Sequence, residues 1–96
     1  MTKADIVKNI SDQTGVDKTD VQMIVEKFMD EVRNSIQKNN NVYLRGFGSF
    51  IVKTRAEKTG RDISKNTAVI IPAHNIPSFK PSKTFVESVK KNVPVG

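Results

Sequence analysis

The sequence has no cysteine, a single histidine and only six aromatic residues among its 96 positions. Without cysteine the chain forms neither disulfides nor thiolate metal sites, so a domain this small needs either a good core or oligomerisation. The lone histidine, His74, has no second ligand type clustered near it, which argues against a metal or catalytic role. No nucleophile–base pair stands out either, and we therefore expect no enzymatic activity and no cofactor.

Long apolar runs are also missing. No stretch approaches the roughly 20 apolar residues that span a membrane, and the segment Met1–Asp5 lacks the features of a signal peptide. These absences predict a soluble, cytoplasmic protein without a membrane partner. The length fits one small domain.

Acidic residues are scarce in the second half of the chain. Residues 1–41 carry six basic and seven acidic side chains, whereas residues 42–96 carry ten basic and three acidic ones. The two parts therefore have net charges of −1 and +7. This segregation favours a surface that binds a polyanion, and a face of merely solvated cations is the alternative.

Two helices are predicted in the first part of the chain. Thr2 and Asp5 have the spacing of a capping box, and Gly15 suits the end of the first helix. Asp17 is expected to cap a second helix. That helix ends at Lys38–Asn41, where an asparagine is available for a left-handed turn.

The second helix carries an apolar stripe that is too wide for one short helix to cover. A second copy of the chain would cover it, so we predict an intertwined homodimer; a groove for a partner helix is the alternative. One sequence also leaves open a heterodimer with a paralogue. The residues predicted to form the dimer core are Val21, Ile24, Val25, Phe28, Val32, Phe47, Phe50 and Phe79.

The second part of the chain alternates as strands do and predicts two long strands that meet at a tip near residues 63–67. Thr59–Gly60 is expected to mark a bend or bulge in this ribbon. Pro72 and Pro77 lie in the returning strand, where proline is tolerated at a sheet edge. Ser82 is expected to cap a last helix. Such a ribbon has almost no core, so a partner outside the chain must order it.

Three features of this basic part have more than one interpretation. Gly46 and Gly48 leave backbone amides open to close approach by a ligand. Lys3, at the start of the first helix, is equally a phosphate contact or a solvated lysine. Ile63, at the far end of a charged arm, either packs on its own hairpin or acts as a wedge between base pairs, and we favour the wedge.

Four motifs then occur in order: Arg45-Gly-Phe-Gly-Ser-Phe50, Arg55-Ala-x-Lys-Thr-Gly-Arg61, Ile71-Pro-Ala73 and Pro77-x-Phe-Lys-Pro-x-Lys83. Together they resemble the bacterial HU and integration host factor family of DNA-bending proteins, over essentially the whole chain. Minor-groove bending of DNA is known from this family itself.

The resemblance implies an α+β fold: an N-terminal helix pair, a three-stranded antiparallel sheet with a long protruding β-ribbon arm, a short C-terminal helix, and an intertwined dimer. The expected parts are a helical dimerisation base (1–41), saddle strands (42–53 and 75–81), a DNA-binding arm (54–74) and the last helix (82–92). The residues that the resemblance implies for DNA binding are Lys3, Arg45, Gly46, Gly48, Lys53, Arg55, Lys58, Arg61, Ile63, Lys65, Lys80 and Lys83.

Two positions depart from the family pattern. Ile63 stands where the family usually has the intercalating proline of an Arg-Asn-Pro run, and Asp62 precedes it. Tyr43 stands where the β-type chain of integration host factor has a glutamate. The expected function is a histone-like, nucleoid-associated protein that binds double-stranded DNA with little sequence specificity. Binding of RNA, or site-specific bending like that of integration host factor, is the alternative.

Overall fold

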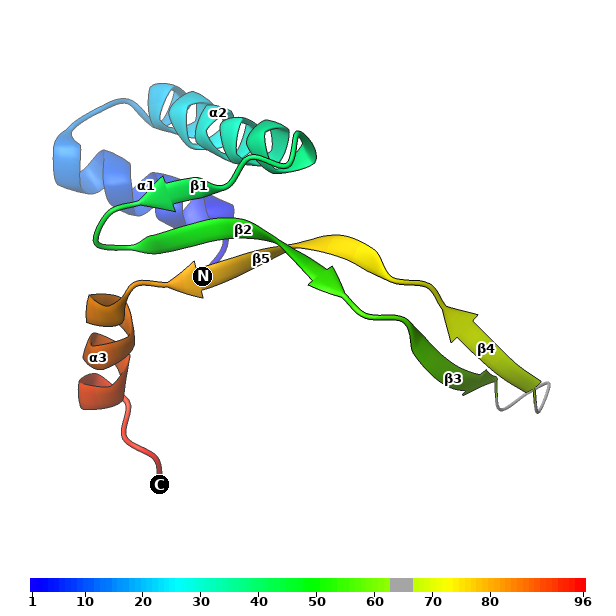
Figure 1. Ribbon diagram of the computed structural model, residues 1–96. Coiled ribbons are helices and arrows are strands. Elements are labelled where there is room, and N and C mark those ends of the chain that lie inside the picture. The colour runs from blue at the N-terminus through cyan, green and yellow to red at the C-terminus, as the bar shows by residue number, and fades with distance from the viewer. Residues whose placement is uncertain (63–66) are drawn as a thin grey trace.

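The computed structural model describes residues 1–62 and 67–96 and shows an elongated molecule of 57 × 36 × 29 Å (Figure 1). In this part of the chain a helix pair precedes five strands and a last helix, which confirms the predicted α+β fold. The elements are α1 (Lys3–Thr14), α2 (Lys18–Gln37), β1 (Val42–Leu44), β2 (Gly48–Arg55), β3 (Lys58–Asp62), β4 (Thr67–Ile71), β5 (His74–Pro81) and α3 (Lys83–Asn92).

Local signals at both ends define α1. The Thr2 hydroxyl accepts a hydrogen bond from the backbone amide of Asp5 at 3.3 Å, and the Asp5 carboxylate accepts one from the amide of Thr2 at 2.9 Å. Gly15 ends the helix in the left-handed conformation, with φ of 74°. The predicted capping box and glycine end are thus confirmed.

Of two further helix-end predictions, the first is confirmed in its position but not in its hydrogen bond, and the second is confirmed. Asp17 precedes α2 at the N-cap position, but its side chain makes no capping hydrogen bond. Its carboxylate lies near the positive end of the helix dipole, so its contribution is electrostatic. At the other end Asn39 has φ of 62°, the left-handed turn that the asparagine run predicted.

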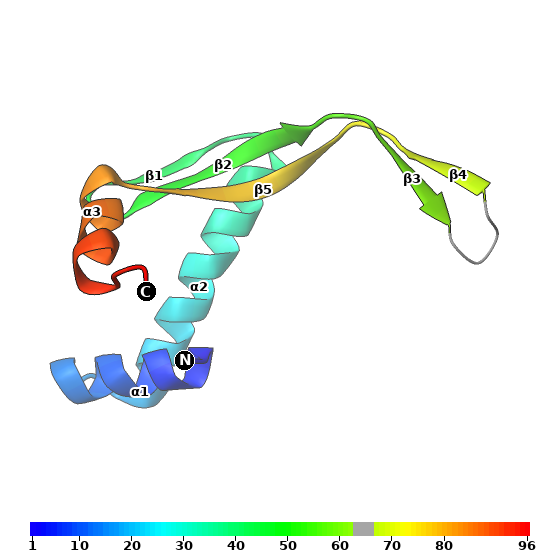
Figure 2. The same ribbon diagram turned by 90° about the horizontal axis from the view of Figure 1, so that it is seen from below.

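The sheet that follows is antiparallel with the strand order β1-β2-β5. Tyr43 pairs with Ser49, and Ser49 pairs with Lys80, so these three side chains share one face. Phe50 pairs with Phe79 on the opposite face. Figure 2 shows α2 reaching this sheet with its C-terminal end, while α1 lies far from the sheet.

The arm is a separate two-stranded ribbon of β3 and β4, beyond an interruption at Ala56–Glu57 on one side and Pro72–Ala73 on the other. The prediction that the ribbon bends at Thr59–Gly60 is wrong, because Gly60 pairs regularly with Val69 within the ladder. Proline has no amide to donate to a ladder, and Pro72 accounts for the break on the returning strand. Pro77 lies in β5, an edge strand, as predicted.

The hydrophobic core within one chain is small. Among the described residues only Val7 and Val21, where α1 meets α2, are buried hydrophobic side chains. Further along the stripe of α2, Ile24 remains 60% exposed and Phe28 46% exposed. A helix with so much apolar surface in water is unfavourable, so another surface must pack against this face of α2.

Four phenylalanines gather on the face of the sheet opposite to Tyr43. The ring of Phe79 lies 5.1 Å from that of Phe47 and 5.0 Å from that of Phe50, while Phe47 stacks on Phe85 at 5.5 Å. The cluster joins β2, β5 and α3, and Ser82 caps α3 by accepting from the amide of Phe85, as predicted. Phe47 nevertheless stays 46% exposed, so this side also needs a cover.

None of the helices in residues 1–62 and 67–96 combines the length and the apolar character that crossing a bilayer requires.

Candidate nucleic-acid interface

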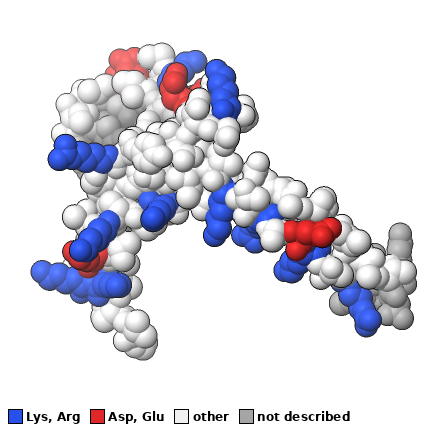
Figure 3. All heavy atoms as spheres, viewed as in Figure 1, with Lys and Arg blue, Asp and Glu red and all other residues white. Residues whose placement is uncertain are grey.

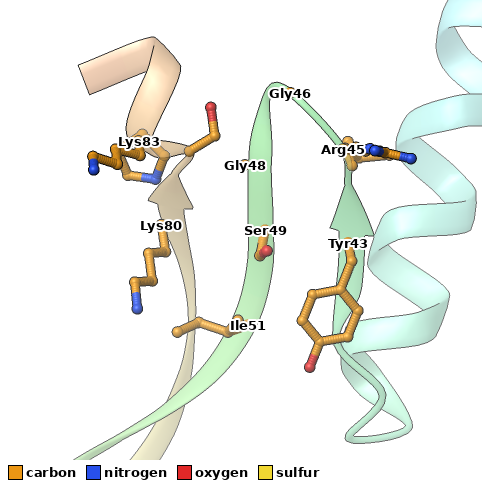
Figure 4. A pocket seen from close by; sticks show the side chains of 11 residues that line it. Tyr43, Arg45, Gly46, Gly48, Ser49, Ile51, Lys80 and Lys83 are labelled. Carbon is orange, nitrogen blue, oxygen red and sulfur yellow. The ribbon is translucent and has the colours of Figure 1, made fainter. Parts of the chain in front are cut away.

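The face of the sheet that carries Tyr43 and Lys80 is hollowed, with a volume of about 580 Å³ (Figure 4). We call this hollow the saddle surface. Its lining comes from β1, β2, the end of β5 and the start of α3. The residues that line it are Tyr43, Leu44, Arg45, Gly46, Gly48, Ser49, Ile51, Lys80, Pro81, Ser82 and Lys83.

A tight turn closes one end of the saddle surface. The amide of Phe47 donates to the carbonyl of Leu44 at 3.0 Å, and Gly46 has φ of 81°, where a side chain is unfavourable. The carbonyl of Phe47 in turn accepts from the amide of Ser82 at 2.9 Å. The turn thereby ties the β1–β2 connection to the start of α3, and Arg45 extends from it away from β2 (Figure 4).

Gly48 is required for a different reason, close packing. A Cβ at this position would lie 2.6 Å from the carbonyl oxygen of Lys80 and 2.6 Å from the ring of Phe79. We expect Gly48→Ala to destabilise the protein by about 1–3 kcal/mol, because β5 must move away from β2. A melting temperature lowered by roughly 4–8 °C per kcal/mol would show this in thermal unfolding.

Gly46→Ala is the matched control for that prediction. Its Cβ meets nothing within 4 Å, so only the positive φ strains it. We expect a cost of about 1–2 kcal/mol with no displacement of β5. A Gly48→Ala protein as stable as the wild type, or a crystal structure with an unmoved β5, would contradict the packing explanation.

A second hollow, of about 710 Å³, lies at the elbow between the sheet and the arm. Lys53, Arg55 and Lys58 line it, and His74 lies beside them. The Nδ1 atom of His74 lies 3.0 Å from the carbonyl oxygen of Pro72, which orients its ring within the break of the returning strand. Three predicted cations thus come together where the arm leaves the sheet.

The strand register distributes the arm cations over both faces of the ribbon. Lys58 pairs with Ile71, and Arg61 pairs with Ala68 three positions further on. Because side chains alternate along a strand, Lys58 and Arg61 point to opposite faces. The apolar residues Val69, Ile70 and Ile71 are all exposed, so the described part of the ribbon has no core. The arm therefore offers cations and apolar contacts on both of its sides.

Among the described residues, Lys3 is the predicted site residue that lies on neither the saddle surface, the elbow nor the arm. It begins α1, which Figure 2 shows far from the sheet. Its ammonium donates to the carboxylate of Glu26 at 2.8 Å, and Gln22 donates to the same oxygen at 3.2 Å. These two hydrogen bonds, from Lys3 first and Gln22 second, lower the pKa of Glu26 below its usual value. A phosphate would have to compete with Glu26 for Lys3.

Two other predicted site residues, Ile63 and Lys65, lie outside the described residues. The saddle surface contains in addition Ser49 and Ile51, which the sequence analysis did not single out. The alternation of β2 is the signal that places both on the same face as Lys53.

The charge distribution follows this geometry. Figure 3 shows Lys and Arg side chains spread along the lower side of the view, from α3 past the sheet to the arm. The acidic side chains in the same view lie on the helix pair at the top, beside α3 and at one place on the arm, where they are outnumbered by Lys and Arg. Within residues 1–62 and 67–96 no three His, Asp or Glu side chains are grouped so as to hold a metal ion. The row of Lys and Arg side chains makes this surface suited to binding a polyanion.

Comparison with known proteins agrees with this assignment. A family model described as bacterial DNA-binding protein matches residues 1–90. The chain is 36% identical over 91 residues to the DNA-binding protein HU of Thermus thermophilus, with 95% of this chain and 94% of that protein covered. It is 36% identical over 97 residues to the integration host factor subunit beta of Marinobacter nauticus, covering 100% and 99% of the two chains.

Solved structures agree with the fold. The chain in a cocrystal structure of Anabaena HU with DNA superimposes with a TM-score of 0.87 at 26% identity, covering 99% of this chain and 100% of that one. HU from Thermotoga maritima, at 24% identity, superimposes with a TM-score of 0.65 over 94% of this chain and 100% of its own length. The chain belongs to the family of bacterial DNA-binding proteins that includes HU and the subunits of integration host factor.

Proposed function

We propose that two copies of this chain bind double-stranded DNA, with the saddle surface against the duplex and one arm from each copy in the minor groove. Membership of the family makes the chain an architectural DNA-binding protein that bends DNA. The single observation that carries the proposal is the row of Lys and Arg side chains that runs from Lys80 and Lys83 at the saddle surface past Lys53, Arg55 and Lys58 at the elbow and on along the arm. A duplex, with its regularly spaced phosphates, fits a surface of this length.

The proposed dimer rests on the apolar surface that one chain leaves uncovered. Ile24 and Phe28 on α2, and the phenylalanine cluster beneath the sheet, are exposed within a single copy. Dimerisation is typical of the family. A second copy that contributes the same two faces would bury them reciprocally, as two-fold interfaces do. We therefore propose a homodimer. A heterodimer with a paralogue is the alternative that an experiment has to test.

The parts of the chain would then have distinct roles. Residues 1–41 form the dimer base, residues 42–53 and 75–81 the saddle, residues 54–74 the arm, and residues 82–92 the flanking helix. Arms that enter a minor groove distinguish chiefly A·T from G·C pairs and sense groove width. We therefore infer weak sequence preference, a place in the nucleoid, and a role in bending and compacting DNA rather than in catalysis.

A gel-shift titration tests this function. Matched linear, nicked and junction duplexes are titrated at two salt concentrations, with bulk RNA as a competitor. We expect preference for the nicked and junction duplexes, because they need less bending energy, and a steep loss of affinity with salt. Equal, salt-insensitive binding to every duplex, or displacement of DNA by RNA at equal mass, would contradict the proposal.

Ile63 is the residue that we propose as the wedge, on sequence grounds alone. Inserting an apolar side chain between base pairs unstacks one step and kinks the duplex. We expect Ile63→Ala to retain most affinity for linear DNA but to reduce the bend angle, measured by energy transfer between the duplex ends. Ile63→Pro, which restores the family residue, is the control and is expected to bend at least as strongly as the wild type. An unchanged bend angle in Ile63→Ala would exclude the wedge.

A further inference from the structure

Two side chains on the saddle surface are unlike their cationic surroundings. Tyr43 is 72% exposed, and Ile51 is only half-buried although it is aliphatic. Figure 4 shows both on the same side of the sheet as Lys80, from the adjacent strands β1 and β2. Leaving an aromatic ring and an aliphatic side chain in water next to lysines stabilises nothing in the free chain.

The two hydrogen bonds of the Asn41 side chain, one accepted and one donated, determine how the Tyr43 hydroxyl is used. The Asn41 side-chain oxygen accepts from the backbone amide of Val52 at 3.1 Å. A backbone amide only donates, so the Asn41 amide oxygen faces Val52 and its NH₂ group faces Tyr43, to which it donates at 3.3 Å. The Tyr43 oxygen is thus an acceptor towards Asn41, and its own hydrogen remains to be donated elsewhere.

The geometry points to Tyr43 as a direct contact to the minor groove of DNA, with Ile51 beside it against the deoxyribose wall. This assignment rests on the proposed function. The floor of the minor groove presents acceptors, N3 of adenine and O2 of thymine, to which the free hydroxyl hydrogen can be donated. Lys80 and Lys83 at the rim of the same hollow would hold the flanking phosphates.

The hydrogen-bond acceptors of the minor groove also predict which base pairs the saddle surface prefers. At G·C pairs the exocyclic amino group of guanine is a donor in the middle of the minor groove, so it opposes a second donor there. Tyr43 would therefore favour A·T pairs beneath the saddle, through a single hydrogen bond per copy. Ile51 adds contact area but no preference, since every nucleotide offers the same sugar.

The experiment uses the full-length protein on A·T-rich and G·C-rich duplexes across a series of salt concentrations. A neutral contact releases no counterions, so it changes affinity without changing the salt slope. We expect Tyr43→Ala to weaken binding by roughly ten-fold at every salt concentration, as two copies each lose a hydrogen bond and an apolar contact. Tyr43→Phe keeps the ring, and we expect a loss of roughly five-fold, confined to the A·T-rich duplex, because each of the two copies loses one hydrogen bond.

Lys80→Ala is the matched comparison from the same surface. It is expected to reduce the salt slope by roughly two per dimer, since about 0.9 counterions are released per phosphate contact. Unchanged affinity in Tyr43→Ala would overturn the assignment. So would a Tyr43→Phe protein whose salt slope changes while its preference for the A·T-rich duplex stays the same. If the wild-type protein itself bound neither duplex, the proposed function would fail instead, which separates the two conclusions.

Discussion

Phe28→Asp is expected to convert the protein into a largely unfolded chain that no longer dimerises. Phe28 lies on the α2 stripe, where one copy leaves it 46% exposed and the proposed second copy buries it. Losing a buried phenylalanine costs about 3–5 kcal/mol, and the dimer contains two. An unpaired carboxylate in the same place adds a desolvation cost. A small domain has about 5–15 kcal/mol of total stability, so this change removes most of it.

Sedimentation and thermal unfolding at several protein concentrations measure this effect. The wild type is expected to sediment as a dimer whose melting temperature rises with concentration. Asn34→Asp places the same charge on the opposite side of α2 and is expected to keep both properties. A Phe28→Asp protein that remains a folded dimer would show that the stripe is not the dimer interface, and the helical base would need another explanation.

The second large effect concerns the arm. Replacing Arg55, Lys58 and Arg61 together by alanine removes three cations per copy and six per dimer. If each contacts a phosphate, the slope of log affinity against log salt becomes shallower by about five. At low salt the affinity for linear duplex is expected to fall by several orders of magnitude, because the duplex can no longer be held in its bent form.

The matched control removes the same charge from the helical base. Lys27, Arg33 and Lys38 are exposed residues on or directly after α2, away from the saddle surface and the elbow. Replacing these three by alanine is expected to leave the salt slope nearly unchanged. Equal losses in both triple variants would mean that net charge alone drives binding, without a defined surface.

Much of the fold could be predicted because its signals are local. The capping box of Thr2 and Asp5, the left-handed turns at Gly15 and Asn39, and the Ser82 cap each depend on a few neighbouring residues. The alternation in the second part of the chain likewise predicted strands, and the observed register adds that Phe50 and Phe79 lie on the face opposite to Tyr43.

The rest could not be predicted because it depends on register and on competing partners. Gly60 looked like a bend in the sequence, but its pairing with Val69 keeps the ladder regular, and the break falls at Ala56–Glu57. The regular pairing also means that no bulge interrupts the alternation between Lys58 and Arg61, so these two side chains point to opposite faces. Lys3 could not be assigned from sequence, since its partner Glu26 lies 23 positions away.

The central claim is that a dimer of this chain bends duplex DNA, and energy transfer between dyes at the two ends of a short duplex tests it most directly. Saturating the duplex with wild-type protein is expected to bring the ends together, with two chains bound per duplex, and adding salt is expected to reverse the change. Full binding with no change in the distance between the ends would contradict the account.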